Sequence, residues 1–180
     1  MPPNSEPKNW YRGEFLLSTE QRLLQVDAIH EAMGSDVFWW AQAIPRDALL
    51  ETLQNSLCFG LYELPQSTSQ IAGQGSPKQI GLMRVITDNV TFAYLTDVYV
   101  LLEYQGKGLG RWILSCLDEV IKAWPHLRRL TLFTSTKSVD LYRTALGAND
   151  WFECKEGLVL GMIEGPGVMK HSSHESKTEH

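Results

Sequence analysis

The segment of the chain best suited to chemistry is a turn with three glycines in five residues. It reads Gln105, Gly106, Lys107, Gly108, Leu109, Gly110 and Arg111. Glycine permits a tight turn and lets a ligand approach backbone N–H groups without a Cβ in the way. Because a helical pattern follows, the free N–H groups and partial positive charge of a helix N-terminus lie there too. The turn predicts a cradle for an anion such as a pyrophosphate, with Lys107 and Arg111 as charges at its rim. The alternative is a glycine-rich turn with solvated basic side chains.

Two other phosphate-binding motifs fit this turn poorly. A P-loop requires GxxxxGK followed by Ser or Thr, and the chain contains no such segment. A dinucleotide fingerprint requires GxGxxG at the start of a βαβ unit. The spacing here is GxGxG, and several expected strands precede the turn.

Hydrophobic periodicity predicts the elements that position the turn. The clearest helix is expected over residues 110–124, where apolar residues form one stripe before Pro125. Other helices are expected after the capping-box pattern at residues 18–21, from Pro45 onward, and over residues 140–146. Strands are expected over residues 14–17, 57–64, 80–87, 91–100, 130–134 and 151–163. Consecutive strands in the middle of a mixed order predict an α/β fold of mixed α+β type, with a mostly antiparallel central sheet flanked by helices.

The length of 180 residues predicts one domain with a core of its own. We expect a flexible N-terminal segment over residues 1–13, the domain over residues 14–163 and a disordered polar tail over residues 164–180. Residues 65–78 lack an apolar period, which predicts a flexible hairpin loop.

Composition narrows the partners and the compartment. A net charge of −5 argues against nucleic acid and anionic membranes as main partners. Three cysteines without CxxC spacing argue against disulfides and a zinc site, so no metal is expected. Without a signal peptide pattern or an apolar run of about 18 residues, we expect a cytoplasmic protein. A homodimer stays open.

These motifs together resemble the GNAT superfamily of N-acetyltransferases. The turn matches its Q/R-x-x-G-x-G/A signature, residues 95–104 match its central strand, and Leu141-Tyr142-Arg-Thr-Ala-Leu-Gly147 resembles its tyrosine helix. The resemblance is closest to a group of small, mostly uncharacterised members and covers roughly residues 15–152. The usual Gly-Phe after the tyrosine helix is replaced here by residues 147–152.

The resemblance implies a splayed sheet and acetyl-CoA as co-substrate. It implies that the cofactor contacts Val98, Tyr99 and Val100, with the pantetheine arm on the backbone of this strand, and that the turn from Gln105 to Arg111 holds the pyrophosphate. A neutral small-molecule amine attacks the thioester directly, and Tyr142 donates a proton to the departing thiolate.

The sequence leaves alternatives for the role of Asp97 and for the acceptor of the acetyl group. Asp97 on the central strand is either the general base, a partner of the substrate ammonium, or a structural group that hydrogen-bonds to a loop or to Arg84. Trp39 and Trp40 either shape the acceptor pocket or pack in the core. Two further functions stay open: a non-catalytic CoA-binding module, and acetylation of a protein amine.

Overall fold

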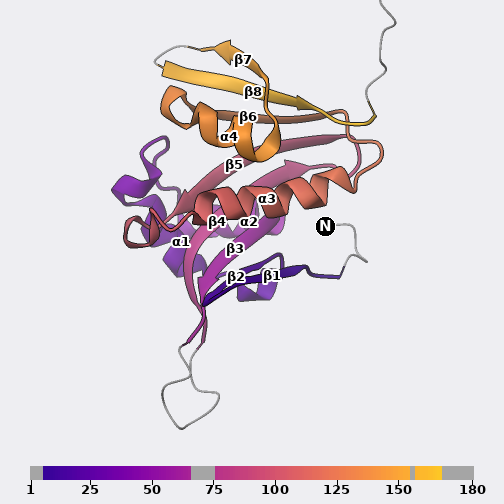
Figure 1. The fold of residues 1–180 in the computed structure, drawn as a ribbon. Coiled ribbons are helices and arrows are strands. Elements are labelled where there is room, and N and C mark those ends of the chain that lie inside the picture. The colour runs from indigo at the N-terminus through magenta and orange to yellow at the C-terminus, as the bar shows by residue number, and fades with distance from the viewer. Residues whose placement is uncertain (1–5, 66–75, 155–156, 168–180) are drawn as a thin grey trace, which may run out of the picture.

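The computed structural model describes residues 6–65, 76–154 and 157–167. Within these residues eight strands form one sheet in the order β1-β2-β3-β4-β5-β6-β8-β7 (Figure 1). The strands are β1 (Asn9–Arg12), β2 (Phe15–Ser18), β3 (Leu57–Glu63), β4 (Lys78–Thr87), β5 (Phe92–Val100), β6 (Arg129–Ser135), β7 (Asp150–Glu153) and β8 (Leu158–Glu164). All neighbouring pairs are antiparallel except β5 and β6, which are parallel. The predicted mixed fold with a mostly antiparallel sheet is confirmed.

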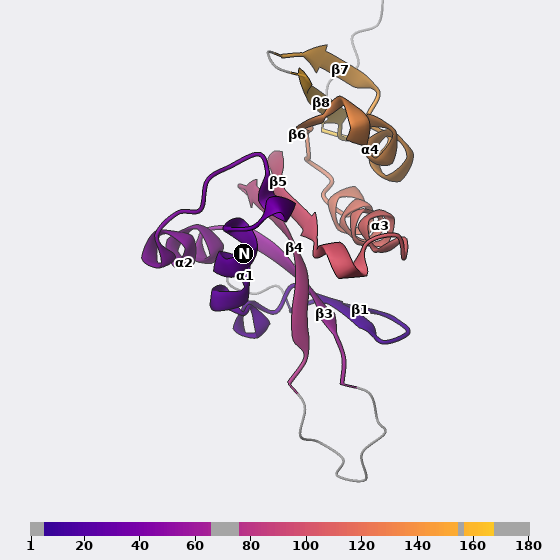
Figure 2. The ribbon, with the colours of Figure 1, turned by 90° about the vertical axis from the view of Figure 1, so that its left-hand side faces the viewer.

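Helices cover both faces of this sheet (Figure 2). They are α1 (Val26–Met33), α2 (Arg46–Gln54), α3 (Leu109–Lys122) and α4 (Val139–Leu146), with short 3-10 turns including η2 (Asp36–Phe38). The apolar stripe of α3 is buried against one face, where Ile113 and Leu117 pack with Phe59, Met83 and Leu95. On the other face, α1 and α2 form a second core over β3, β4 and the end of β5. The apolar residues that recur about every 3.6 residues along α3 are therefore buried against the sheet.

The sheet opens between β5 and β6. Their pairing runs from Phe92 opposite Arg129 to Leu95 opposite Leu132 and goes no further. A β-bulge follows in β5. Leu82 and Arg84 are two residues apart on β4, but their partners on β5, Tyr99 and Thr96, are three residues apart. A bulge bends its strand and increases the local twist. The remaining length of β5 thus diverges from β6.

The N-terminus corrects one expectation. Residues 9–12 are not flexible: they form β1, whose Trp10 lies opposite Leu17 of β2. The Trp10 ring stacks on Phe59 at 5.9 Å, and its Nε1–H donates to Glu119 of α3. Hairpin pairing together with burial of an aromatic ring outweighs the polar, proline-containing composition on which the expectation was based.

Two other boundaries also differ. Ser18 ends β2 rather than capping a helix, and α1 begins only at Val26, because the backbone of residues 15–18 pairs with β3. At the other end β8 continues to Glu164, and the N–H of Gly165 donates to the carbonyl of Arg128. The tail predicted from residue 164 is thus ordered as far as residue 167, while residues 168–180 lie outside the described part, as do residues 66–75 of the predicted loop.

No helix in the described ranges combines the length and the apolar character needed to cross a membrane.

Candidate active site

A cleft of about 920 Å³ occupies the opening between β5 and β6. Its walls are residues 94–100 of β5, residues 133–135 of β6, Leu141 and Tyr142 of α4, most of the glycine turn, and part of residues 36–40. The cleft therefore brings the predicted tyrosine next to the predicted strand and turn, which lie at least thirty residues earlier in the sequence.

The turn has the backbone geometry that the glycines predict. Gly106 and Gly108 adopt φ values of +77° and +73°, in the left-handed region where side chains other than glycine are strained. Gly108 is the N-cap of α3 and supplies no capping side chain, and the first turn of the helix carries no acidic residue. Its first N–H groups are thus available to an external acceptor, as an anion site at a helix N-terminus requires.

The side chains of Gln105 and Lys107 both contact other groups of the protein, and of the two only Gln105 also lines the cleft. The Gln105 side chain donates to the carbonyl of Val100 at 2.9 Å, which ties the turn to the end of β5. The Lys107 ammonium lies 5.2 Å from the centre of the Tyr104 ring and 5.5 Å from that of Phe15. Of the two cationic side chains expected at the rim, only Arg111 lines the cleft.

Arg12 is a functional candidate that sequence reasoning missed. Its Nη1 donates to the carbonyl of Gly108 at 3.0 Å and its Nη2 to the carbonyl of Lys107 at 3.3 Å. The guanidinium thus holds two carbonyls at the back of the turn and adds a positive charge beside it. Because the contact joins β1 to residues far along the chain, nothing in the local sequence pattern signals it.

Tyr142 lies on α4 and is buried at the wall of the cleft. Burial disfavours the phenolate and raises the pKa of Tyr142 to about 12, against a smaller opposite contribution from Thr134. The phenol therefore keeps its proton throughout the neutral range. A protonated hydroxyl facing the cleft is suited to donate to a developing anion there.

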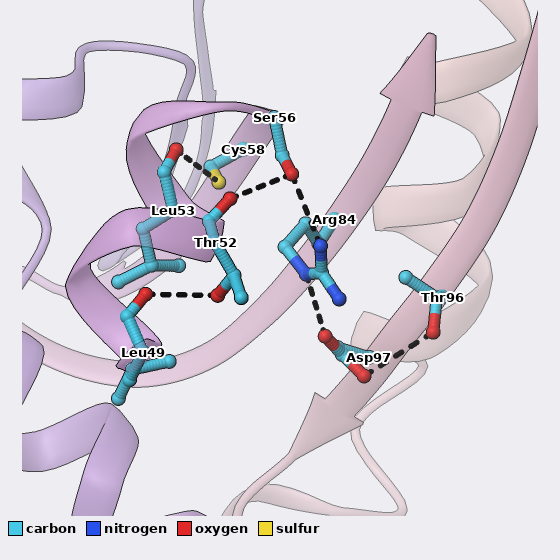
Figure 3. A network of polar contacts seen from close by, with 8 residues as sticks. All are labelled: Leu49, Thr52, Leu53, Ser56, Cys58, Arg84, Thr96 and Asp97. Carbon is cyan, nitrogen blue, oxygen red and sulfur yellow. Dashed lines mark hydrogen bonds and ion pairs between the residues drawn. The ribbon is translucent and has the colours of Figure 1, made fainter. Parts of the chain in front are cut away.

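Asp97 belongs to a polar network that links β5 to β4 and α2 (Figure 3). Its Oδ2 lies 2.6 Å from Nε of Arg84, and the two side chains are only 10% and 14% exposed. Arg84 also donates to the Ser56 hydroxyl, which in turn donates to the carbonyl of Thr52 on α2. Asp97 lies in the bulge with φ of +51° and borders the cleft. Among its three roles, the geometry favours the structural one, because Arg84 already neutralises the carboxylate.

Part of the lining of the cleft is aromatic and acidic. Phe38 is buried and packs edge-on against Tyr99, whereas Trp39 is 64% exposed and lines the cleft with Trp40. The charged residues among the cleft's described walls are Asp36, Asp97 and Arg111.

No cysteine lines this cleft. Cys58 and Cys116 are buried, and burial raises the pKa of their thiols to about 12 and about 11. A thiol with so high a pKa is a poor nucleophile. Within the described residues no group of three potential metal ligands occurs either. The arrangement fits direct transfer between two bound substrates better than a covalent enzyme intermediate.

The comparisons with known proteins agree with this site. Residues 30–148 match the model of the acetyltransferase (GNAT) family, so the chain belongs to that family. A protein of Gibberella zeae named only as an acetyltransferase is 47% identical over 174 residues, which cover 91% of this chain and 97% of that protein. The thialysine N-epsilon-acetyltransferase of Sus scrofa is 42% identical over 77 residues, or 42% of this chain and 44% of the other.

Solved structures give the same fold. A GNAT-family acetyltransferase structure from Xanthomonas campestris is 32% identical, with a TM-score of 0.57, and covers 76% of this chain and 84% of that one. The spermidine N-acetyltransferase of Vibrio cholerae, solved with CoA and spermine, has a TM-score of 0.57 at 16% identity and covers 85% of this chain and 96% of its own.

Proposed function

We propose that this protein transfers the acetyl group of acetyl-CoA to a primary amine of a small molecule. The observation that carries the proposal is a single cleft lined by an uncapped helix N-terminus, by carboxylates and indoles, and by a protonated tyrosine.

The walls fit CoA in chemistry and in size. The N–H groups of the first turn of α3 would hold the pyrophosphate, since glycine at positions 106 and 108 leaves that backbone accessible. The bulged end of β5 pairs with β4 but not with β6. Its peptide groups at Val98 and Val100 would be free on the β6 side to bind the pantetheine arm. A volume of about 920 Å³ lies within the range of pockets for ligands of this size. Acetyl-CoA, when bound, would supply the activated acetyl thioester, and CoA would leave as the thiol.

The chain's own residues then supply orientation and one proton. The amine nitrogen forms a bond to the acetyl carbon as the carbon–sulfur bond breaks, and Tyr142 gives its phenolic proton to the sulfur. The amine loses a proton to solvent water or to a carboxylate. Since Asp97 is already paired with Arg84, water reaching the open cleft is the acceptor that the geometry supports.

The acceptor is proposed to be a small cation. Because Asp97 is paired with Arg84, Asp36 is the carboxylate of the cleft proposed to attract an ammonium group. The face of an exposed indole binds such a group by a cation–π interaction. Proteins similar to this chain that are named for a substrate include the thialysine and spermidine acetyltransferases, whose substrates are small amines. They also include ribosomal-protein-alanine acetyltransferases from Escherichia coli and Vibrio fischeri, which share the fold at 18% and 15% identity.

Cofactor binding is tested by thermal denaturation. We expect acetyl-CoA and CoA at 100 times their dissociation constant to stabilise the native protein by about 2.7 kcal/mol and to raise its melting temperature by several degrees. NADH and ATP, which lack the pantetheine arm, should shift it far less. Equal stabilisation by ATP, or none by CoA, contradicts the proposal.

A screen of amines with acetyl-CoA, in which release of free thiol is measured, distinguishes an enzyme from a non-catalytic CoA-binding module. A peptide amine accepted in preference to every small amine would favour protein acetylation.

The contact of Arg12 with the turn predicts a binding defect without loss of fold. We expect Arg12→Met to weaken CoA binding about tenfold, because the carbonyls of Lys107 and Gly108 lose the guanidinium donor and the turn loses its nearby positive charge. The measurements are the CoA dissociation constant and the melting temperature without ligand, which should change little because these contacts are exposed. Arg46→Met, which breaks an exposed ion pair with Asp27 elsewhere, is the control. Unchanged CoA affinity in Arg12→Met would remove this residue from the site.

A further inference from the structure

Strand β5 contains one residue more than a regular alternation of its side chains allows. In a regular strand, side chains two residues apart share a face of the sheet. Leu95 and Val100 nevertheless both pack in the core that contains α3, whereas Tyr99 packs in the core of α1 and α2. An odd separation on one face requires one inserted residue. Asp97 is that residue, because it lies between the paired residues Thr96 and Tyr99 and has a left-handed φ of +51°.

The inserted residue decides which backbone groups of β5 face the cleft. Along a strand, the N–H and C=O groups of successive residues point alternately to its two edges. One edge of β5 pairs with β4, and the other is unpaired beyond Leu95, where the strand lines the cleft. Without Asp97 as an insertion, the register beyond it would slip by one residue. The peptide groups of Val98 and Val100 would then point to the opposite edges.

The Arg84 side chain holds Asp97 in this conformation. Its Nε donates to Oδ2 of Asp97 at 2.6 Å, and the Thr96 hydroxyl donates to Oδ1 at 3.2 Å. The side chains of the ion pair are 14% and 10% exposed, so water competes little for the bond. A charge-assisted hydrogen bond is stronger than one between neutral groups. A non-glycine residue keeps a left-handed backbone only where its surroundings hold it there, and the guanidinium is the strongest of these contacts.

Arg84 is in turn fixed by α2. Its Nη1 donates to the Ser56 hydroxyl at 3.0 Å, and that hydroxyl donates to the carbonyl of Thr52 at 2.7 Å (Figure 3). Thr52 lies in the last turn of α2, where carbonyls lack helical partners and the helix carries a partial negative charge. The guanidinium is therefore attracted by this helix end as well as by Asp97. Through these bonds Arg84 ties the bulge of β5 to α2.

We infer that Arg84 is a positioning residue for the cofactor. By holding Asp97 in the bulge, it sets the backbone of residues 98–100, against which the pantetheine arm binds. Arg84 is not among the described residues that line the cleft, so it acts through Asp97 and not by touching CoA. The effect on the cofactor rests on the proposed function, whereas the hold of Arg84 on the bulge does not.

The bulge is tested without a ligand by the backbone chemical shifts and the HN–Hα coupling of Asp97, which report its φ. Arg84→Met keeps the apolar stem of the side chain and removes the guanidinium. We expect the values of Asp97 in this variant to move from those of left-handed backbone to those of an extended strand. If the unpaired carboxylate unfolds Arg84→Met, the same measurement is made on Arg84→Lys. Its ammonium balances the charge but lacks the rigid fork that spans Ser56 and Asp97, so the same change is expected at smaller size.

The dissociation constant of CoA tests the effect on the cofactor. We expect Arg84→Met to raise it about tenfold or more, because the strand is no longer preorganised for the ligand. Adding Asp97→Gly to Arg84→Met should restore the constant to within about threefold of the wild-type value, since glycine adopts a positive φ without strain and leaves no carboxylate unpaired. Leu53→Ala removes core packing of α2 away from the cleft and is the control. It should lower the melting temperature and leave CoA affinity unchanged.

Three outcomes would overturn the inference. The first is an Arg84→Met variant with the Asp97 shifts and the CoA affinity of the wild type. The second is a double variant that binds CoA as weakly as Arg84→Met, because the lost charge and not the bulge would then explain the defect. The third is an equal loss of affinity in Leu53→Ala, which would reduce the effect to stability. A wild type that binds no CoA contradicts the proposed function instead, and the shifts of Asp97 still decide whether Arg84 holds the bulge.

Discussion

Tyr142→Phe is expected to lower kcat by about 100-fold or more, the usual scale of a lost acid–base contribution. The substitution removes only the hydroxyl, so the ring still packs in the buried position that Tyr142 occupies on α4. The departure of a thiolate is accelerated most by a proton donor near neutral pH. The donor must itself be protonated at that pH until the carbon–sulfur bond breaks. The CoA dissociation constant should change little, because the variant keeps the wall of the cleft. Steady-state rates with any accepted amine measure the effect.

The pH dependence adds a second signature. Burial raises the pKa of Tyr142 to about 12, so the protonated form that donates is present at every pH below that value. We therefore expect no loss of rate from ionisation of this group up to about pH 10 in the wild-type protein. In Tyr142→Phe the rate should rise with pH, since a thiolate needs less help to leave as the solution becomes more basic. A variant with a flat profile and a rate within a factor of about two of the wild type would remove Tyr142 from the mechanism.

Tyr62 provides a matched control for this experiment. It is also a buried tyrosine with a pKa raised by burial, but it lies on β3, does not line the cleft, and its hydroxyl has no hydrogen-bond partner among the described residues. Tyr62→Phe should leave kcat unchanged. Removal of an unpaired buried hydroxyl should not destabilise the protein. A similar loss of rate in both variants would indicate a general effect of packing rather than proton donation.

Gly108→Val should abolish the stabilisation of the protein by CoA. Gly108 has φ of +73° at the N-cap of α3, a conformation that a β-branched residue adopts only with strain, and an added Cβ would lie 3.4 Å from the Arg12 guanidinium. The strain displaces the N–H groups of the first turn, and the new side chain covers the anion site that they form. The measurements are the melting temperature with and without CoA, and circular dichroism, which should stay largely native.

Gly147→Val separates strain from binding. Gly147 ends α4 with φ of +69°, and a Cβ there meets no atom within 4 Å. The two variants should therefore lose similar stability without ligand, on the order of 1–2 kcal/mol each for a left-handed residue. Only Gly108→Val should lose the CoA-induced shift. Loss of the shift in both variants would mean that destabilisation, and not the cradle, explains the result.

The local sequence determined the parts of the site that depend on neighbouring residues. The apolar stripe after the glycine turn predicted a helix over residues 110–124, and α3 spans Leu109–Lys122. The glycines permit a left-handed backbone at the turn, and the structure has it at Gly106 and Gly108. Helical periodicity and glycine geometry act over a few residues, so a short window of sequence contains them.

Tertiary structure alone decided which distant groups meet. Arg12 reaches the turn because β1 pairs with β2, and Lys107 turns from the cleft because the Phe15 and Tyr104 rings lie behind it. Asp97 becomes a partner of Arg84 because a bulge in β5 offsets the register with β4. Register and bulges are set by hydrogen bonding between strands far apart in the chain, and the pattern of any one strand fits several registers.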